Sequence, residues 1–397
     1  MTDAALAPSR PRPGARQRTT TGWVTPSRLI GLAIGALFAG PAAFVVWRTI
    51  RLGGDLGDVL SEVPAPLWRT IQLSVLVSTS TAVLGTGLAW LTTRTDLPGR
   101  RLWRIALVLP LVLPSFVGAA AFIAGLAPGG VLYDALTAVG ITPPSRFRGL
   151  GASWLVLTAF TYPYVYLPVA ARLLRLRSSL EESGRMLGLS STATFFKVTL
   201  PQLRTAVFGG ALLVFLYTLS EFGAVQLLGY DTLTRVIFAS RQTNRALSFA
   251  AASVVLVLAL GVVALERSQR GVSRPDDRAS MLTRHPTHLR WGTVPALAVC
   301  TLVLSVGLLV PVASLATWAQ RGLADGRVGF GELVQPAMST AIVAIAAAIA
   351  ATVIVLPIAL ATTRRPHRSS DIAAVSVVVG FAIPGLVLAL ALAVLTL

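Results

Sequence analysis

The sequence is poor in the residue types that soluble enzymes and metal sites depend on. Its 397 residues include one cysteine, Cys300, which excludes a disulfide framework and a thiolate metal cluster. The three histidines all lie in polar loops, so we expect no metal site. The single lysine, Lys197, follows two phenylalanines and has no glycine-rich loop before it. A phosphate-binding loop of the GxxxxGK[ST] type is therefore absent, and we expect no ATP site, no catalytic residue and no cofactor in this chain.

Charge is also scarce, and long apolar runs take its place. Charged residues make up 13% of the chain and apolar residues 54%. Such runs satisfy their backbone polar groups in lipid only as helices, because the alternation that a barrel strand needs is missing. The sequence predicts an all-α polytopic membrane protein with about nine transmembrane helices. The predicted spans are 29–46, 71–92, 105–126, 149–171, 205–228 (interrupted by Glu221), 246–265, 291–320, 333–363 and 372–397.

The net charge of +18 follows the loops and forms no basic stripe of the kind that holds a nucleic acid. If the N-terminal tail is inside, the inside loops hold 24 of the 34 lysines and arginines and the outside loops hold 10. This positive-inside bias predicts a cytoplasmic N-terminus in a cell membrane. Residues 1–28 lack the apolar core and cleavage site of a signal peptide, so we expect a disordered cytoplasmic tail.

The sequence repeats itself after 270 positions. Pro66 meets Pro336, Thr70 meets Thr340, and the run 92–94 falls on 362–364 without a gap. Prolines and loop charges do not coincide in this way by chance. We expect a first unit at 29–266, a cytoplasmic linker at 267–290 and a parallel second unit at 291–397. The second unit stops after three spans, so we also expect the chain to be either a fragment of a longer protein, which we favour, or a truncated gene product.

A charged stretch between the fourth and fifth spans has a distinctive spacing. A glutamate and two small residues are followed, after three positions, by a glycine that permits a turn. Nine positions later come a β-branched residue, a leucine and a proline that suits the first turn of a helix. The residues in this spacing are Glu182, Ser183, Gly184, Gly188, Val198, Leu200 and Pro201.

This spacing resembles the "EAA" cytoplasmic loop of ABC-importer permeases, with Ser-Gly in place of Ala-Ala and Val in place of Ile. The segments 70–100, 108–117, 161–168 and 220–238 are most similar to the fused two-unit permeases for ferric iron and thiamine. The resemblance implies a type I importer fold, with type-1 domains at about 67–266 and from about 336. It also implies an ABC ATPase that docks on residues 182–201 and an extracytoplasmic substrate-binding protein.

The spans contain few polar residues that are candidates for a gate or a pathway. Glu221, Phe222 and Gly223 match a D/E-F-G sequence that the family often carries at this place. Glu221 is either part of the outer gate or an interfacial carboxylate at a helix end. Tyr162 and Tyr166 share a helix face, where packing between helices is a commoner role than substrate contact. The prolines of the third and fourth spans predict kinked helices.

These features favour the permease subunit of an ATP-driven importer, with ferric iron as the favoured substrate. Thiamine or another small solute is the alternative, because the motifs do not define the substrate. A gradient-driven carrier is a second alternative, disfavoured by the scarcity of charge within the spans. A membrane enzyme would need a cluster of acid, base or metal ligands at one depth, and the sequence shows none.

Overall fold

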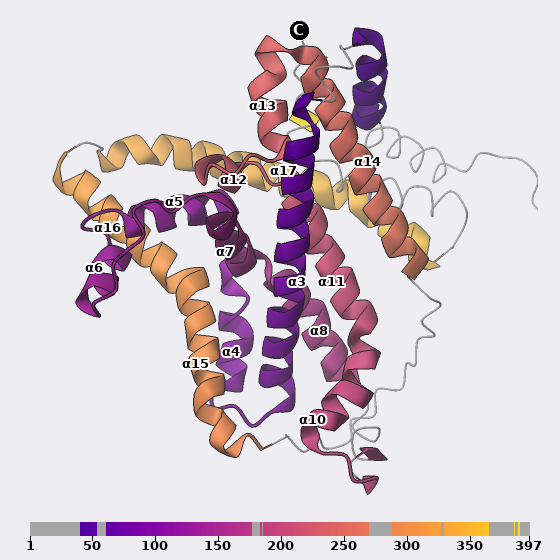
Figure 1. Cartoon of the computed structure of the whole chain (residues 1–397), viewed down its shortest axis with the longest axis vertical. Helices are drawn as coiled ribbons and strands as arrows, with labels where there is room; N and C mark the ends of the chain where they lie inside the picture. Colours follow the sequence, from indigo (N-terminus) through magenta and orange to yellow (C-terminus); the bar gives the residue numbers. More distant parts are fainter. Residues whose placement is uncertain are drawn as a thin grey trace, which may run out of the picture.

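The computed structural model describes residues 40–53, 61–176, 183–184, 186–269, 288–326 and 329–364, together with 385, 388 and 389. These residues are helical and contain no β-strand, which confirms the predicted all-α class. Figure 1 shows α3 (Pro64–Arg94), α11 (Leu200–Ser220) and α15 (Thr293–Leu304) running roughly along the longest axis of the molecule, whereas α17 (Phe330–Arg364), in light orange to yellow, lies across them.

Six helices of this part of the chain are long and apolar enough to cross a membrane. Their bounds are Pro64–Arg94 (α3), Gly149–Arg175 (α7 and α8), Phe195–Ser220 (η2 and α11), Arg245–Leu265 (within α14), Thr293–Ala324 (α15, η4 and α16) and Gly331–Leu356 (within α17). A seventh follows if the bent pair described below counts as one span. The predicted nine is therefore approximate. The first predicted span is described only from residue 40, as a helix at 40–52, and the ninth lies almost wholly outside the described residues.

The third predicted span is not one helix. Residues 100–112 form α4 (Arg100–Ala106) and a short 3-10 helix, η1 (Leu109–Val112), and α5 (Ser115–Leu126) then leaves at 92°. The sequence predicted only a kink here. Pro110 and Pro114 both lack a backbone N–H, and Pro114 takes an extended ψ of 140°, so the helix ladder stops and restarts.

Prolines are accommodated differently in the fourth and fifth spans. Pro163 starts α8 (Pro163–Arg175) directly after α7 (Gly149–Thr161), so these two helices form one candidate span. Pro201 is at the start of α11 (Leu200–Ser220), as the sequence predicted, but the chain is already helical from Ser191. A π-helical turn, η2 (Phe195–Thr199), lies between α10 (Ser191–Thr194) and α11. A second π turn, η4 (Ser305–Leu309), comes just before Pro311 of α16 (Val310–Ala324).

The core of the first unit lies where α3, α8 and α11 pack together. Small residues bring the backbones close: a Cβ at Gly85 of α3 would lie 2.9 Å from the backbone nitrogen of Tyr166. A Cβ at Gly210 of α11 would lie 2.8 Å from the Cα of Val165. This is the small-residue packing that membrane helices use when lipid offers no hydrophobic driving force.

A second cluster joins helix 40–52 to α14 (Arg245–Gln269). The Thr49 hydroxyl bonds to the Ser253 hydroxyl at 2.8 Å and donates to the Phe249 carbonyl at 3.0 Å. Two short helices that the sequence did not predict lie within the predicted outer loops. They are α6 (Val131–Ala138) and α13 (Leu233–Thr243).

The described part of the second predicted unit begins with α15 (Thr293–Leu304) and continues to α17 (Phe330–Arg364). The 270-residue register pairs α3 (Pro64–Arg94) with the described residues 334–364 of α17. The Thr70 hydroxyl donates to the Pro66 carbonyl at 2.7 Å, and the Thr340 hydroxyl donates to the Pro336 carbonyl at 2.8 Å. The two helices therefore share a local hydrogen bond at paired positions.

Candidate functional site

The predicted loop at 182–201, hereafter the coupling segment, makes a tight turn at Gly188. Gly188 has a φ of +85°, in the left-handed region that residues with a Cβ rarely adopt. The Leu189 N–H donates to the Gly184 carbonyl at 3.1 Å, the long bond of a Schellman motif that ends a helix with glycine. The turn that the sequence placed at Gly188 is therefore present. Glu182 lies outside the described residues.

Of the two small residues before this turn, Gly184 faces the start of the fifth span. Gly184 is buried, and a Cβ there would lie 3.4 Å from Cγ2 of Val198 and 3.5 Å from Cδ1 of Leu189. Alanine therefore fits at Gly184, whereas a larger side chain would overlap Val198. Ser183 is exposed, and its carbonyl accepts the Leu187 N–H at 3.1 Å.

The other side of the coupling segment presents apolar side chains to solvent. Met186 is 89% exposed, Leu187 is 84% exposed and Phe196 is 59% exposed. Neighbouring Phe195 packs edge-on against Trp90 of α3, with ring centroids 5.6 Å apart. The segment is thus fixed to α3 on one side and apolar and uncovered on the other. Leu200 and Pro201 continue it directly into α11.

A second contact at the same end of the bundle joins the predicted linker to the first unit. Asp96, between α3 and α4, accepts the Leu289 N–H at 2.9 Å and bonds to Nδ1 of His288 at 2.9 Å. The hydrogen bond from the Leu289 backbone, followed by that from His288, holds the pKa of the Asp96 carboxyl below its usual value. The end of the predicted linker is therefore attached to the first unit.

The other end of α11 carries the predicted gate residues Glu221, Phe222 and Gly223, hereafter the gate segment. The sequence treated 205–228 as one run, but α11 ends at Ser220, Glu221 is extended, and a short helix, α12 (Gly223–Leu227), follows. Oε1 of Glu221 accepts the Ala224 N–H at 2.8 Å at the start of α12. Oε2 of Glu221 accepts the Ser115 hydroxyl at 2.8 Å.

Aromatic side chains surround the gate segment. The rings of Phe222 and Phe238 lie 4.7 Å apart between centroids. Arg241 places its guanidinium 3.6 Å from the centroid of the Phe238 ring. Gly223 packs directly on α5, since a Cβ there would lie 2.8 Å from Cβ of Phe116. The segment is held between α5 and α13.

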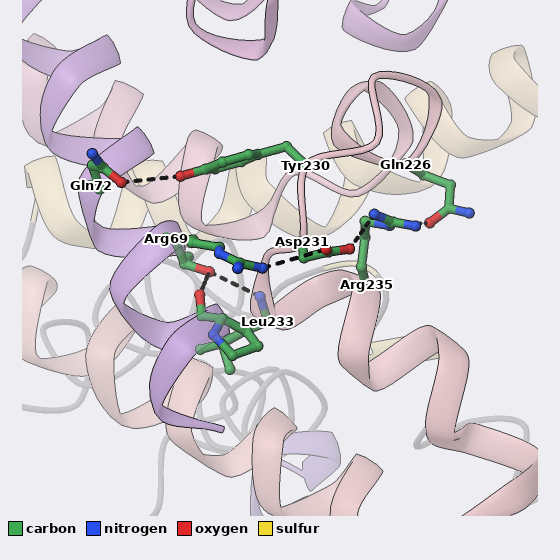
Figure 2. Close-up of polar contacts among 9 residues, drawn as sticks. Arg69, Gln72, Gln226, Tyr230, Asp231, Leu233 and Arg235 are labelled. Atoms are coloured by element: carbon green, nitrogen blue, oxygen red, sulfur yellow. Dashed lines mark hydrogen bonds and ion pairs between the residues drawn. The ribbon is translucent and has the colours of Figure 1, made fainter. Parts of the chain in front are cut away.

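Polar contacts then fasten the chain after α12 to the start of α3, as Figure 2 shows. Asp231 pairs with Arg235 and lies 3.4 Å from Arg69 of α3. The Tyr230 hydroxyl donates to Oε1 of Gln72 at 3.2 Å. The Thr70 hydroxyl accepts the Leu233 N–H at 2.9 Å. Exposed ion pairs of this kind contribute little stability, so the buried Thr70 bond gives the firmer attachment.

Tyr162 and Tyr166, the other pathway candidates, both lie in the core. The Tyr162 hydroxyl donates to the Leu107 carbonyl at 2.6 Å, and the Tyr166 hydroxyl bonds to that of Thr92 at 3.0 Å. Both side chains are buried and link α8 to its neighbours. This geometry suits helix packing, which the sequence indicated as the commoner role.

Two residues of the gate region escaped the sequence reasoning. Ser115 touches Glu221 from a helix 106 positions away, and the Tyr217 hydroxyl donates to Oγ of Ser115 at 3.0 Å. The one available signal was a serine directly after Pro114, at the start of a helix. Among the described residues, no group of three or more His, Cys, Asp or Glu side chains is placed to hold a metal ion.

Residues 81–274 match the family described as "Binding-protein-dependent transport system inner membrane component". The chain is also similar to named permeases. It is 29% identical over 387 residues to the Fe(3+)-transport system permease protein FbpB 2 of Haemophilus influenzae, which covers 93% of this chain and 71% of that protein. It is 30% identical over 212 residues to the molybdenum transport system permease protein ModB of Escherichia coli, covering 50% of this chain and 91% of ModB. It is 25% identical over 273 residues to the sulfate transport system permease protein CysW of Escherichia coli, covering 65% of this chain and 92% of CysW.

Proposed function

This chain belongs to the family of binding-protein-dependent transport system inner membrane components, the permeases of ABC importers. From this membership we propose which of its residues contact the partners, transmit force and form the gate. It is a membrane permease of the type I importer fold. The proposal concerns its partners, its orientation, its coupling segment, its gate and its substrate.

The coupling segment, residues 182–201, docks an ABC ATPase. The observation that carries this assignment is the glycine turn at Gly188 with Met186 and Leu187 exposed beside it. Exposed apolar side chains on a short rigid turn are the kind of surface that a soluble partner covers. Phe195 against Trp90 supplies a path for force into α3, and Pro201 leads into α11 without a break in the helix. Glu182 to Pro201 transmit that force, and ATP hydrolysis belongs to the partner.

The end of the bundle that carries the coupling segment faces the cytoplasm, together with the N-terminus. The excess of lysine and arginine in the loops of this end supports the orientation. Asp96 with Leu289 and Arg94 with Leu176 join parts of the chain that were predicted on the same side. At the other end, Arg69 pairs with Asp231, both on the predicted outside. A substrate-binding protein delivers substrate to that outer end. The protein is a multi-pass component of the inner membrane.

The predicted domains remain those of the sequence: a first permease unit at 29–266, with a type-1 domain at about 67–266, a linker at 267–290 and a second unit from 291. The gate segment, Glu221 to Gly223, closes the outer end of the first unit. Its position at a break after α11, packed on α5, supports this assignment. Tyr162 and Tyr166 stabilise the packing of α8 through their buried hydroxyl bonds to Leu107 and Thr92.

The proposed substrate is ferric iron, which the name of the Haemophilus influenzae relative specifies for that protein. A second candidate class is an oxyanion, because the similar permeases ModB and CysW are named for molybdenum and sulfate. Thiamine stays a third candidate. Iron handed over by a binding protein needs no dedicated ligand cluster in the permease.

Uptake measurements separate these candidates. The full transporter, with its ATPase and binding protein, would be placed in vesicles and offered radiolabelled ferric iron, molybdate, sulfate and thiamine in turn. We expect ATP-dependent accumulation of iron alone. Accumulation of an oxyanion or thiamine would show that ferric iron is not the substrate and would identify the substrate instead. Accumulation driven by an ion gradient without ATP would contradict the importer mechanism.

A further inference from the structure

Two helix breaks meet at one carboxylate in this structure. The third span bends by 92° between Val112 and Ser115, and α11 ends at Ser220. Glu221, the first residue after α11, accepts the hydroxyl of Ser115, the first residue of α5, at 2.8 Å. A hydrogen bond thus joins the bend of one span to the end of another.

The hydrogen bonds around this contact run in one direction. The Tyr217 hydroxyl donates to Oγ of Ser115 at 3.0 Å, and Ser115 donates to Oε2 of Glu221. Successive hydrogen bonds of this kind polarise and strengthen one another in a site of low dielectric constant. Ser115 is 4% exposed, so water cannot easily replace its bond to the carboxylate.

The carboxylate also holds the gate segment in place on its other side. Oε1 of Glu221 accepts the Ala224 N–H at 2.8 Å, and the Glu221 carbonyl accepts the Thr234 hydroxyl at 2.7 Å. A movement of Glu221 would therefore change the start of α12 and would also change the contact between Glu221 and Thr234 of α13. Gly223 lies against Phe116 of α5, which reinforces the link between α5 and the gate segment.

We propose that Ser115 and Tyr217 are positioning residues for the Glu221 carboxylate. These three residues, hereafter the triad, join the bent third span to the gate segment. The inference rests on the proposed gate role of Glu221 to Gly223. With the triad intact, the two breaks move as one unit and the gate stays closed at rest. Without it, the gate segment opens without the binding protein.

The test measures ATP hydrolysis by the full transporter in lipid nanodiscs, with and without its binding protein. Ser115→Ala removes the donor to the carboxylate. Tyr217→Phe removes only a hydroxyl and keeps the ring beside Tyr164. The matched control is Ser220→Ala, next to Glu221, because the Ser220 hydroxyl donates to the Leu216 carbonyl of its own helix.

We expect Ser115→Ala to raise hydrolysis without binding protein about tenfold or more, the factor expected for one hydrogen bond to a charged group. Tyr217→Phe should raise it by less, and Ser220→Ala should leave it unchanged. Ser115→Thr, which keeps a hydroxyl, should keep hydrolysis without binding protein close to the wild-type rate. A purely structural defect would instead lower the rates with and without binding protein together, and that outcome would overturn the inference.

One more variant, Glu221→Gln, separates this inference from the proposed gate. If Glu221→Gln raises hydrolysis without binding protein while Ser115→Ala and Tyr217→Phe match the wild type, the gate stands and the positioning role is wrong. If Glu221→Gln also matches the wild type, the gate role fails and the inference fails with it.

Discussion

The same substitution should impair coupling at one glycine of the coupling segment and be tolerated at another. Gly188 and Gly184 lie four positions apart, at the turn and in the preceding helix. Gly188 has a φ of +85° with open space around its Cα, so the conformation and not the volume restricts it. Gly184 is helical and has space for one methyl group. We expect Gly188→Ala to impair coupling and Gly184→Ala to preserve it.

The magnitudes follow from the geometry. An L-residue in the left-handed region costs roughly 1–2 kcal/mol, which lowers the population of the native turn by about 5- to 30-fold. At Gly184 the new Cβ would touch Val198 at 3.4 Å, an ordinary van der Waals distance. Alanine also favours a helix over glycine by roughly 0.5–1 kcal/mol. Gly188→Asn should lie between the two, because asparagine tolerates the left-handed region better than alanine.

The assay compares ATP-driven uptake and ATPase stimulation by binding protein in the reconstituted transporter, at equal amounts of inserted permease. Gly188→Ala should reduce both by several-fold, Gly188→Asn by less, and Gly184→Ala by little. Gly188→Glu, which adds a long charged side chain beside the docking surface, should abolish both while the protein remains inserted. Normal coupling by Gly188→Ala together with loss of coupling by Gly184→Ala would refute the reasoning.

Two further predictions concern stability and pH. Gly223→Ala should destabilise the permease by about 1–3 kcal/mol in thermal unfolding, because the Cβ would lie 2.8 Å from Cβ of Phe116; Gly209→Ala, with nothing within 4 Å, should be neutral or slightly stabilising. Unchanged melting of Gly223→Ala would contradict the packing of the gate segment on α5. The lowered pKa of Asp96 means that its bond to the Leu289 N–H is fully present above pH 3.8 and is lost as the pH falls through the lower value. Amide exchange of Leu289, corrected for the intrinsic rate, should show protection at pH 6 that disappears in Asp96→Ala, which has no side-chain acceptor; equal exchange in both proteins would disprove the contact.

The sequence predicted the features that depend on local spacing. The turn at Gly188 followed from a glycine six residues after Glu182, and the disruption of the third span followed from Pro110 and Pro114. The bend angle of 92° in the third span could not be predicted from the sequence. The angle depends on the helices that α5 packs against, which include α16 and α12. Proline chemistry indicates where a helix stops and leaves the new direction to tertiary contacts.

The contacts of Glu221 could not be predicted from the sequence either, because they also depend on tertiary packing. Ser115 is 106 positions away, and the spacing of residues does not indicate that a bent span returns it to the end of α11. The sequence predicted a loop where α13 lies because the residues of this helix are less apolar than a span requires. The π turns before Pro201 and Pro311 were also missed, since no local pattern distinguishes them from an α-helix.

Site-specific photo-crosslinking from Leu187 tests the central claim most directly. A photoreactive residue at Leu187, which is 84% exposed, would be compared with one at Ile141, which is 54% exposed in the predicted outer loop. In the assembled transporter we predict a crosslink from position 187 to the ATPase and none from position 141. A crosslink from position 187 to the binding protein, or labelling of that position from outside the cell, would contradict both the coupling segment and the orientation.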